Sequence, residues 1–580
     1  MGVTSSFWKR ISYTLRYYKR PLLLDLTAII VGVLTGLTIV IFRLTIEFFH
    51  RIFFELIDSS LEYTLGTYTI VFLPALGGLI VGILFSAVKL DRDDIEITGI
   101  IKSIQHRMGI LSITNIPMGL IGAAITMGSG GSAGREAPSA VAGAGIGCGI
   151  SRLLKIKGQD RILLIVAGLA SGISATFNAP LGGLMFGIEL LFGELSVPQL
   201  IPITLACFTS TVVTYLILGQ EVTVYLPPIG AIKNPMEYFL FAILGLISGI
   251  LAAFWVKSDF LIKDFFERWG VPEYLKPALG GLMVGLIGLW RPEVLGMQYH
   301  SLQEVATSPV ELAVWVIFAI GILKMIATSL TLGSGGAGGN LAPAVFIGGF
   351  IGAAFAYVCS QLFAIPISSV IPYVLVGMAA FLGASIGIPL TAIVIVGEIT
   401  GEQTIVLPLM IGVATSAISA HLFVKPLGLY RVSLAKSGIK IGWRIPELAR
   451  VPVDTAMRSR SETITVHPDS TLAEVEKFFI KYGFRHYPVV KNSTVLGVIS
   501  IDDVEKVPID KRESTKVEEI MDRNFVRVYP DESLWEALEK MLDKGKDFAI
   551  VVSRDNEDEY LGMLTEEDII RIYEVLHTHF

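Results

Sequence analysis

Long apolar segments restrict the fold of this chain more than any other sequence feature. They recur from Leu22 onward, for example at 24–41, 239–254 and 313–332. A helix needs about 20 mostly apolar residues to cross the hydrocarbon core of a bilayer, and backbone polar groups in lipid must find their partners within the protein. We therefore predict a mainly α-helical protein that crosses a membrane many times.

A second group of apolar segments is short and interrupted by Gly and Pro. Examples are 137–150, 180–192 and 389–400. Helices that break within the membrane are tolerated only where protein or a watery cavity pairs their backbone. These segments predict broken helices around an internal pathway.

Charged residues are unevenly distributed. They make up 17% of a chain that is 52% hydrophobic, which is too apolar for a soluble protein, yet they are dense from 454 to 580, where we expect a soluble part. The segment 1–21 carries a basic cluster: Lys9, Arg10, Arg16, Lys19 and Arg20. The positive-inside bias predicts that this segment is cytoplasmic. No apolar core with a cleavage site follows, so we expect a retained anchor and no signal peptide.

Cysteine spacing and net charge exclude several classes of protein. Cys148, Cys207 and Cys359 each lie in an apolar segment, and their scattered positions predict buried free thiols without a disulfide framework or a metal site. The net charge of −6 does not suggest a nucleic-acid partner.

The membrane part contains an internal repeat. Residues 128–138 read GSGGSAGREAP and residues 333–343 read GSGGAGGNLAP, while 177–189 and 386–398 share a Pro-Leu pair and a closing Glu at the same spacing. Duplicated, Gly- and Pro-interrupted segments point to two inverted repeats with a transport site at their interface. Two unrelated glycine clusters for helix packing are the alternative.

Each Gly-rich loop leads into a helix, and this arrangement suits an anion. Backbone amides and helix N-termini bind anions through partial charges. Small residues around Gly134 and Gly339 let the backbone approach a ligand, and Pro138 and Pro343 suit an early helical turn. We expect both loops to direct amides at one region.

These motifs resemble those of the CLC family of chloride channels and proton/chloride exchangers. Residues 134–138, GREAP, are similar to the family's GREGP motif, and 339–343, GNLAP, are similar to its GxFxP motif. The resemblance extends over nearly the whole chain. It implies a homodimer with one pathway per subunit and chloride bound by amides at the loops, those of Arg135, Ala137, Asn340, Leu341 and Ala342.

Glu136 is the predicted gate. An acidic side chain inside an anion-binding loop competes for the site as a carboxylate and leaves when it is protonated. Burial and nearby anions favour the protonated form, so proton concentration and anion occupancy are coupled through it. The alternative is a loop glutamate that only pairs with Arg135.

Two hydroxyl groups complete the central site in the family. Residues 97–101, ITGII, stand where the family has GSGIP, so Thr98 and Gly99 remain but the first Gly and the Pro are lost. The resemblance still implies chloride or bromide in preference to nitrate or fluoride. The second hydroxyl is assigned to Tyr430, whose alternative role is an interfacial aromatic anchor.

Leu190 bears on the choice between channel and exchanger. Many exchangers of the family carry an inner proton-relay glutamate at this position, and a leucine cannot titrate. The substitution favours channel-like or weakly proton-coupled chloride conduction. A proton/chloride antiporter that uses Glu136 without the inner glutamate is the alternative.

The soluble part contains a second repeat. Residues 465–490 and 497–504 are echoed by 527–552 and 562–569, each copy reading strand, helix, strand, strand, helix. The helices are expected to open at Ser470 and Asp531.

This repeat resembles a tandem pair of CBS domains. We assign the transmembrane domain to 22–434, with repeats at about 22–220 and 236–434. The linker is 435–452, and an α+β CBS pair occupies 453–580, with its copies at about 453–508 and 515–580.

CBS pairs often bind adenine nucleotides through a Ser or Thr and an Asp three residues later. Ser500 with Asp503 and Thr565 with Asp568 have this spacing, so the pair can bind ATP, ADP or AMP. The same spacing is an ordinary helix N-cap, and a purely structural tail is the alternative. No cofactor is expected to be required.

Other classes of membrane protein with CBS domains fit less well. A zinc protease needs HExxH, which is absent from the sequence, and a magnesium pathway needs carboxylate ligands where this chain has Gly amides. A membrane-tethered nucleotide sensor without flux leaves the duplicated membrane part unexplained. We expect no enzyme activity and no catalytic or metal-binding residues, in an integral protein of the plasma membrane with both termini in the cytoplasm.

Overall fold

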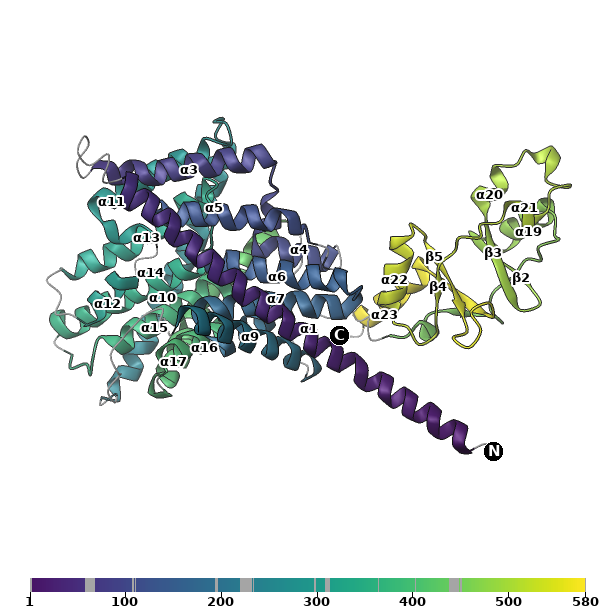
Figure 1. The fold of residues 1–580 in the computed structure, drawn as a ribbon, viewed down its shortest axis with the longest axis horizontal. Coiled ribbons are helices and arrows are strands. Elements are labelled where there is room, and N and C mark those ends of the chain that lie inside the picture. The colour runs from purple at the N-terminus through teal and green to yellow at the C-terminus, as the bar shows by residue number, and fades with distance from the viewer. Residues whose placement is uncertain are drawn as a thin grey trace. The chain divides into compact units, whose positions relative to one another are not determined.

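The computed structural model describes residues 3–57, 68–106, 109, 111–192, 197–219, 232, 234–296, 299–307, 313–363, 365–401, 403–437, 448 and 451–578. The chain divides into two compact units, Met1–Trp443 and Arg444–Phe580. The first is built from helices and the second from helices and short strands (Figure 1).

The helices of the membrane unit follow one another as two comparable series. The first series is α1 (Val3–His50), α3 (Thr69–Val88), α4 (Ile97–His106), α5 (Ile116–Gly128), α6 (Glu136–Leu153), α7 (Gly158–Phe177), α8 (Pro180–Gly187) and α9 (Val197–Leu218). The second is α10 (Met236–Arg268), α11 (Lys276–Trp290), α12 (Tyr299–Thr307), α13 (Val314–Gly333), α14 (Leu341–Tyr357), α15 (Ile371–Leu382), α16 (Pro389–Thr400) and α17 (Val406–Phe423). α18 (Leu429–Lys436) follows both series.

Single-turn segments interrupt or join these helices. The π-helical segments are η1 (Arg51–Ile57), η5 (Ile188–Phe192), η7 (Val358–Leu362) and η8 (Gly383–Gly387). The 3₁₀ segments of this unit are η3 (Arg92–Ile95), η4 (Ile113–Asn115), η6 (Pro292–Val294) and η9 (Gln403–Ile405). The short apolar segments of the sequence are α6, α8 with η5, and α16, so the prediction of broken helices is confirmed.

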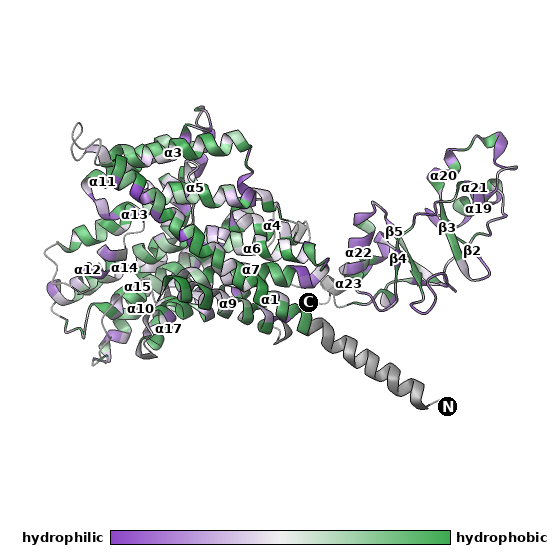
Figure 2. Cartoon of the chain, in the orientation of Figure 1, coloured by the Kyte–Doolittle hydropathy of each residue, from purple (hydrophilic) through white to green (hydrophobic). Residues whose placement is uncertain are grey.

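Among the described residues, eight helices are long and apolar enough to cross a membrane. Hydrophobic residues make up much of the helices in this unit (Figure 2). The long apolar segments predicted from the sequence coincide with parts of α1, α10 and α13, to within one residue at the start of α13. The mainly α-helical membrane fold is therefore confirmed.

Equivalent helices of the two series make equivalent contacts. α1 packs on α9 as α10 packs on α17, and α6 packs on α7 as α14 packs on α15. A β-carbon on Gly143 would overlap the carbonyl oxygen of Gly168 where α6 crosses α7, and Gly348 meets Gly377 in the same way where α14 crosses α15. Small residues at the same crossings let both helix pairs approach closely.

The prediction that the cysteines are buried free thiols is confirmed. Cys148, Cys207 and Cys359 are free and buried within the membrane unit.

The second unit contains two short sheets. Its strands are β1 (Arg458–Ser459), β2 (His486–Lys491), β3 (Thr494–Ser500), β4 (Arg527–Val528), β5 (Phe548–Val552) and β6 (Tyr560–Thr565). One sheet has the order β1-β6-β5-β4 and the other pairs β2 with β3. Its helical segments are η11 (Val453–Thr455), α19 (Leu472–Tyr482), α20 (Ile501–Glu505), η12 (Ile509–Lys511), α21 (Val517–Ile520), α22 (Leu534–Asp543) and α23 (Glu566–Thr578).

The two copies have the same register at their closing strands. His486 pairs with Ser500, and Phe548 pairs with Thr565, so each candidate hydroxyl ends a strand and precedes a helix. The first copy lacks a regular first strand, because only an isolated bridge joins Val466 to the neighbouring β2. The prediction of a regular first strand in this copy is therefore wrong.

The helix starts predicted at Ser470 and Asp531 are also wrong by one or two residues. α19 begins after Thr471 and α22 begins after Ser533. Each of these residues forms a capping box with a Glu three positions later, which satisfies two amides at the helix start.

Candidate functional site

The two Gly-rich loops meet at Gly134 and Gly339. The amide of Gly134 donates to the carbonyl oxygen of Gly339 at 2.8 Å, and the amide of Gly339 donates back to Gly134 at 2.9 Å. A β-carbon on Gly339 would lie 2.5 Å from the β-carbon of Ala137, and one on Gly134 would lie 2.9 Å from that of Ala342. Glycine at both positions therefore allows the N-termini of α6 and α14 to come together.

Glu136, the first residue of α6, is fully buried at this junction. It is 0% exposed, and neither carboxylate oxygen accepts a hydrogen bond from another described residue. The guanidinium groups of Arg135 and Arg43 and the backbone amides of Glu136 and Ala342 act on it electrostatically. Arg43 is held in place by a 3.0 Å bond to the carbonyl oxygen of Thr176.

The two predicted hydroxyl groups face one cavity in the membrane unit. Thr98 in α4 and Tyr430 in α18 line it together with Ala137, Pro138 and Asn340. The Tyr430 hydroxyl and the Asn340 side-chain oxygen are buried without a hydrogen-bond partner among the described residues. The cavity thus brings together polar groups from segments far apart in the sequence.

Other candidate residues do not line this cavity. Gly99 approaches the backbone of Asp93, and Leu341 and Ala342 are buried in the first turn of α14. Pro343 is the third residue of the same helix. Leu190 is buried in η5.

Four charged side chains of the cavity were missed by the sequence reasoning. They are Arg92, Glu96, Asp259 and Lys263. The Thr98 hydroxyl donates to Glu96 Oε2 at 3.1 Å. Two signals were present in the sequence: a carboxylate two residues before the candidate hydroxyl, and an acidic residue inside the apolar α10.

Asp259 belongs to a buried hydrogen-bonded chain. Its Oδ1 accepts from the Ser329 hydroxyl at 2.8 Å, and the Ser329 oxygen accepts from Trp255 Nε1 at 3.2 Å. This chain joins α10 to α13 beside the cavity.

The closing glutamates of the second repeated motif bind across the repeats. Glu398 accepts from the amides of Leu181 and Gly182 at 3.1 and 2.8 Å. Glu189 accepts from the amides of Leu390 and Thr391 at 3.0 and 2.7 Å. Each glutamate therefore satisfies the free amides at the start of the other repeat's short helix.

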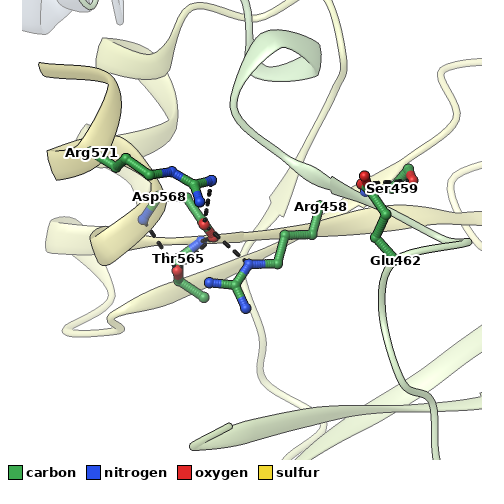
Figure 3. Close-up of polar contacts among 6 residues, drawn as sticks. All are labelled: Arg458, Ser459, Glu462, Thr565, Asp568 and Arg571. Carbon is green, nitrogen blue, oxygen red and sulfur yellow. Dashed lines mark hydrogen bonds and ion pairs between the residues drawn. The ribbon is translucent and has the colours of Figure 1, made fainter. Parts of the chain in front are cut away.

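In the second unit, the Thr565 and Asp568 side chains form a polar cluster (Figure 3). Asp568 is 1% exposed and accepts from the Thr565 hydroxyl at 2.7 Å. Arg458 Nε lies 3.1 Å and Arg571 Nη2 3.3 Å from its Oδ1. Arg458 and Thr565 line a cavity together with Arg485.

Ser500 and Asp503 form the matching cluster of the first copy. The Ser500 hydroxyl donates to Asp503 at 2.6 Å, and Lys506 Nζ lies 2.8 Å from the same carboxylate. Burial alone would raise the pKa of Asp503, but the bonds from Lys506 and Ser500 hold it below its usual value. Ser500 with Asp503 and Thr565 with Asp568 therefore both act as helix caps, which is the alternative role predicted from their spacing.

No group of three His, Cys, Asp or Glu side chains suited to a metal ion occurs in the part of the chain that the structure describes.

Family models match both parts of the chain. The voltage gated chloride channel model matches residues 77–421, and the CBS domain model matches 453–509 and 517–575. Chloride channel protein CLC-f of Arabidopsis thaliana is 28% identical over 531 residues, which are 87% of this chain and 62% of that protein. This chain thus spans less than two thirds of that relative.

Another relative is bacterial. The H⁺/Cl⁻ exchange transporter ClcA of Citrobacter koseri is 28% identical over 431 residues, which cover 72% of this chain and 89% of that protein.

Two solved structures share the fold. A slow cyanobacterial Cl⁻/H⁺ antiporter has a TM-score of 0.64 at 22% identity and covers 71% of this chain and 97% of its own. A eukaryotic CLC transporter has a TM-score of 0.61 at 19% identity and covers 94% of this chain and 98% of its own.

Proposed function

Since the chain belongs to the voltage gated chloride channel (CLC) family and carries a C-terminal pair of CBS domains, we propose that it conducts chloride across a membrane. The pathway runs past the junction of the two Gly-rich loops, and Glu136 is its gate. The relatives named as a chloride channel and as a H⁺/Cl⁻ exchange transporter support chloride as the substrate.

One observation carries this proposal: the Glu136 carboxylate is buried at the loop junction without a hydrogen-bond partner among the described residues. An unpaired carboxylate in a low-dielectric site is costly. It lowers its free energy by binding a proton or by leaving the site. Either event removes the negative charge that competes with an anion at the starts of α6 and α14.

Thr98 and Tyr430 are proposed to contribute hydroxyl donors to the bound chloride. Their support is that both line one cavity with Asn340, and that the Tyr430 hydroxyl is buried without a partner among the described residues. A hydroxyl that can donate to a halide would satisfy its own hydrogen-bonding need.

We propose channel-like or weakly proton-coupled conduction. Leu190 supports it, because it is buried at the position where a titratable glutamate would relay protons. The alternative, a proton/chloride antiporter that uses Glu136 alone, is supported by the exchangers among the relatives. Reversal potentials in opposed chloride and pH gradients separate the two, since an ideal channel ignores the pH gradient.

Chloride flux from purified protein in liposomes tests the gate. Glu136→Gln and Glu136→Ala are expected to conduct without the pH dependence of the unaltered protein, because neither side chain ionises. Flux that keeps its rate and pH dependence in both variants would contradict the gating role. Absence of flux from every variant would favour a membrane-tethered sensor.

The CBS pair is proposed to bind ATP, ADP or AMP at the cavity lined by Arg458, Arg485 and Thr565. Two guanidinium groups suit phosphate oxygens. Titration of each nucleotide into the full-length protein tests this proposal, with heat of binding and change in flux as readouts. No response to any nucleotide would favour a structural tail.

We further propose a homodimer with one pathway per subunit, in the plasma membrane with both termini in the cytoplasm. The family supports the dimer, and the basic cluster within the first 20 residues supports the orientation.

A further inference from the structure

Glu96 holds the hydroxyl group that is assigned to the anion. It follows η3 directly and is partly buried, and its Oε2 accepts from the Thr98 hydroxyl at 3.1 Å. A threonine hydroxyl has one proton. While that proton is donated to Glu96, Thr98 has no donor for an anion.

Glu96 lines the same cavity as Tyr430, among a set of charged groups. Arg92 comes from its own turn, and Asp259 and Lys263 come from α10. The carboxylates of Glu96 and Asp259 therefore line one cavity. Like charges that share a site favour protonation of one of them.

Other charged groups of this turn are bonded elsewhere. Asp93 pairs with Lys102 at 2.9 Å, and Asp94 accepts from Asn115 Nδ2 at 2.8 Å. The hydroxyl of Thr98 is therefore bound to one carboxylate of this cluster, that of Glu96.

We propose that Glu96 is a second titratable switch, which controls anion binding through the Thr98 hydroxyl. As a carboxylate, it accepts this hydroxyl and repels an anion from the cavity. When it takes up a proton, the repulsion ends and the hydroxyl becomes available to the anion. Anion binding from the cavity is thereby linked to the uptake of one proton by Glu96. Leu190 cannot provide such a link, because its side chain does not titrate.

This inference rests on the proposed chloride pathway. Glu96 acts as a positioning residue, because it reaches the anion through Thr98. Its effect should appear in the pH profile of binding, which a merely structural residue would not change.

Chloride titration into the purified full-length protein at about pH 4 and about pH 8 tests the proposal, since a model-peptide Glu side chain changes its charge near the lower of these values. A Glu136→Gln background removes the pH dependence of the gate. In this background, chloride should bind about tenfold tighter at the lower pH, the scale of one charge-assisted hydrogen bond. Further substitution of Glu96→Gln or Glu96→Ala should bring the tighter binding to both pH values.

Asp93→Asn is the matched control, because it removes a neighbouring carboxylate that does not contact Thr98. It should keep the pH dependence. Thr98→Val should abolish the gain from Glu96→Ala, since the released hydroxyl is then missing.

Two outcomes would overturn the inference: unchanged pH dependence in both Glu96 variants, or a full gain from Glu96→Ala in the Thr98→Val background. If chloride flux responds to Glu136→Gln but binding ignores Glu96, this inference fails and the proposed function stands. If the unaltered protein neither binds nor conducts chloride, both fail.

Discussion

Gly134 and Gly339 exchange a reciprocal pair of backbone hydrogen bonds, 2.8 and 2.9 Å long. They occupy equivalent positions in two loops of the same length, 205 residues apart in the sequence (339 minus 134). The symmetry of the two repeats therefore passes through this bridge, beside the buried Glu136 carboxylate.

Gly339→Ala should disrupt the bridge. Its β-carbon would lie 2.5 Å from that of Ala137, and overpacking of this kind costs about 1–3 kcal/mol. We expect a lower unfolding temperature in detergent and a loss of chloride flux. Gly270→Ala is the control, because its β-carbon would point into open space; equal effects of the two substitutions would argue against a special role for the bridge.

Glu189→Ala and Glu398→Ala should destabilise the membrane unit by similar amounts. Each removes a carboxylate that accepts two backbone amides at the start of a helix in the other repeat, and loss of such a cap costs about 0.5–2 kcal/mol. Thermal unfolding with Glu304→Ala as the control measures the effect, since Glu304 is exposed and lies 3.8 Å from His300. A loss confined to one variant would show that the caps are not equivalent.

Asp503→Asn should make the first CBS copy less stable at neutral pH. Although burial opposes it, the pKa of Asp503 lies below its usual value because Lys506 and Ser500 bond to the carboxylate. A lowered pKa gives stability that is full above the unfolded value, about 3.9, and is lost as pH falls through the folded value. The difference from the unaltered protein should therefore shrink below about pH 4.

Hydrogen exchange of the α20 backbone across this pH range measures the Asp503 effect. Asp502→Asn serves as the control, since Asp502 is exposed on the same helix. A pH-independent difference would refute this linkage.

Arg458→Ala should destabilise the second CBS copy. Asp568 is buried and has Arg458 and Arg571 as its cationic partners, and removal of one partner of a buried ion pair costs about 3–5 kcal/mol. We expect about 2 kcal/mol, because Arg571 remains. Chemical unfolding followed beside Arg523→Ala tests this value, since the Arg523 and Glu518 side chains are both exposed.

Much of the membrane fold was predictable because a lipid bilayer restricts which backbone structures can cross it. Apolar length indicated α1, α10 and α13, and Gly and Pro interruptions indicated α6, α8 and α16. The duplicated motifs also identified the residues that meet at the loop junction. The pairing of Gly134 with Gly339 was not predictable in detail, because it depends on how close the two helix starts come.

The cavity was only partly predictable. Thr98 and Tyr430 were found through motifs, but Glu96 and Asp259 have no motif and are brought there by packing of separate helices. The repeated motif identified Glu189 and Glu398 as equivalent residues. It did not predict that each caps a helix of the other repeat, because that contact depends on the three-dimensional structure. The short caps of α19 and α22 were misplaced because several neighbouring residues can cap a helix.

The crossed glutamate caps make each half of the membrane unit depend on the other. A chain of half this length would have no carboxylate of its own for the start of its short helix, and would obtain one from a second copy facing the other way. In this chain the two halves supply each other: Glu189 binds the amides of residues 390 and 391, and Glu398 binds those of 181 and 182. Neither half of the membrane unit is therefore complete without the acid that the other half provides.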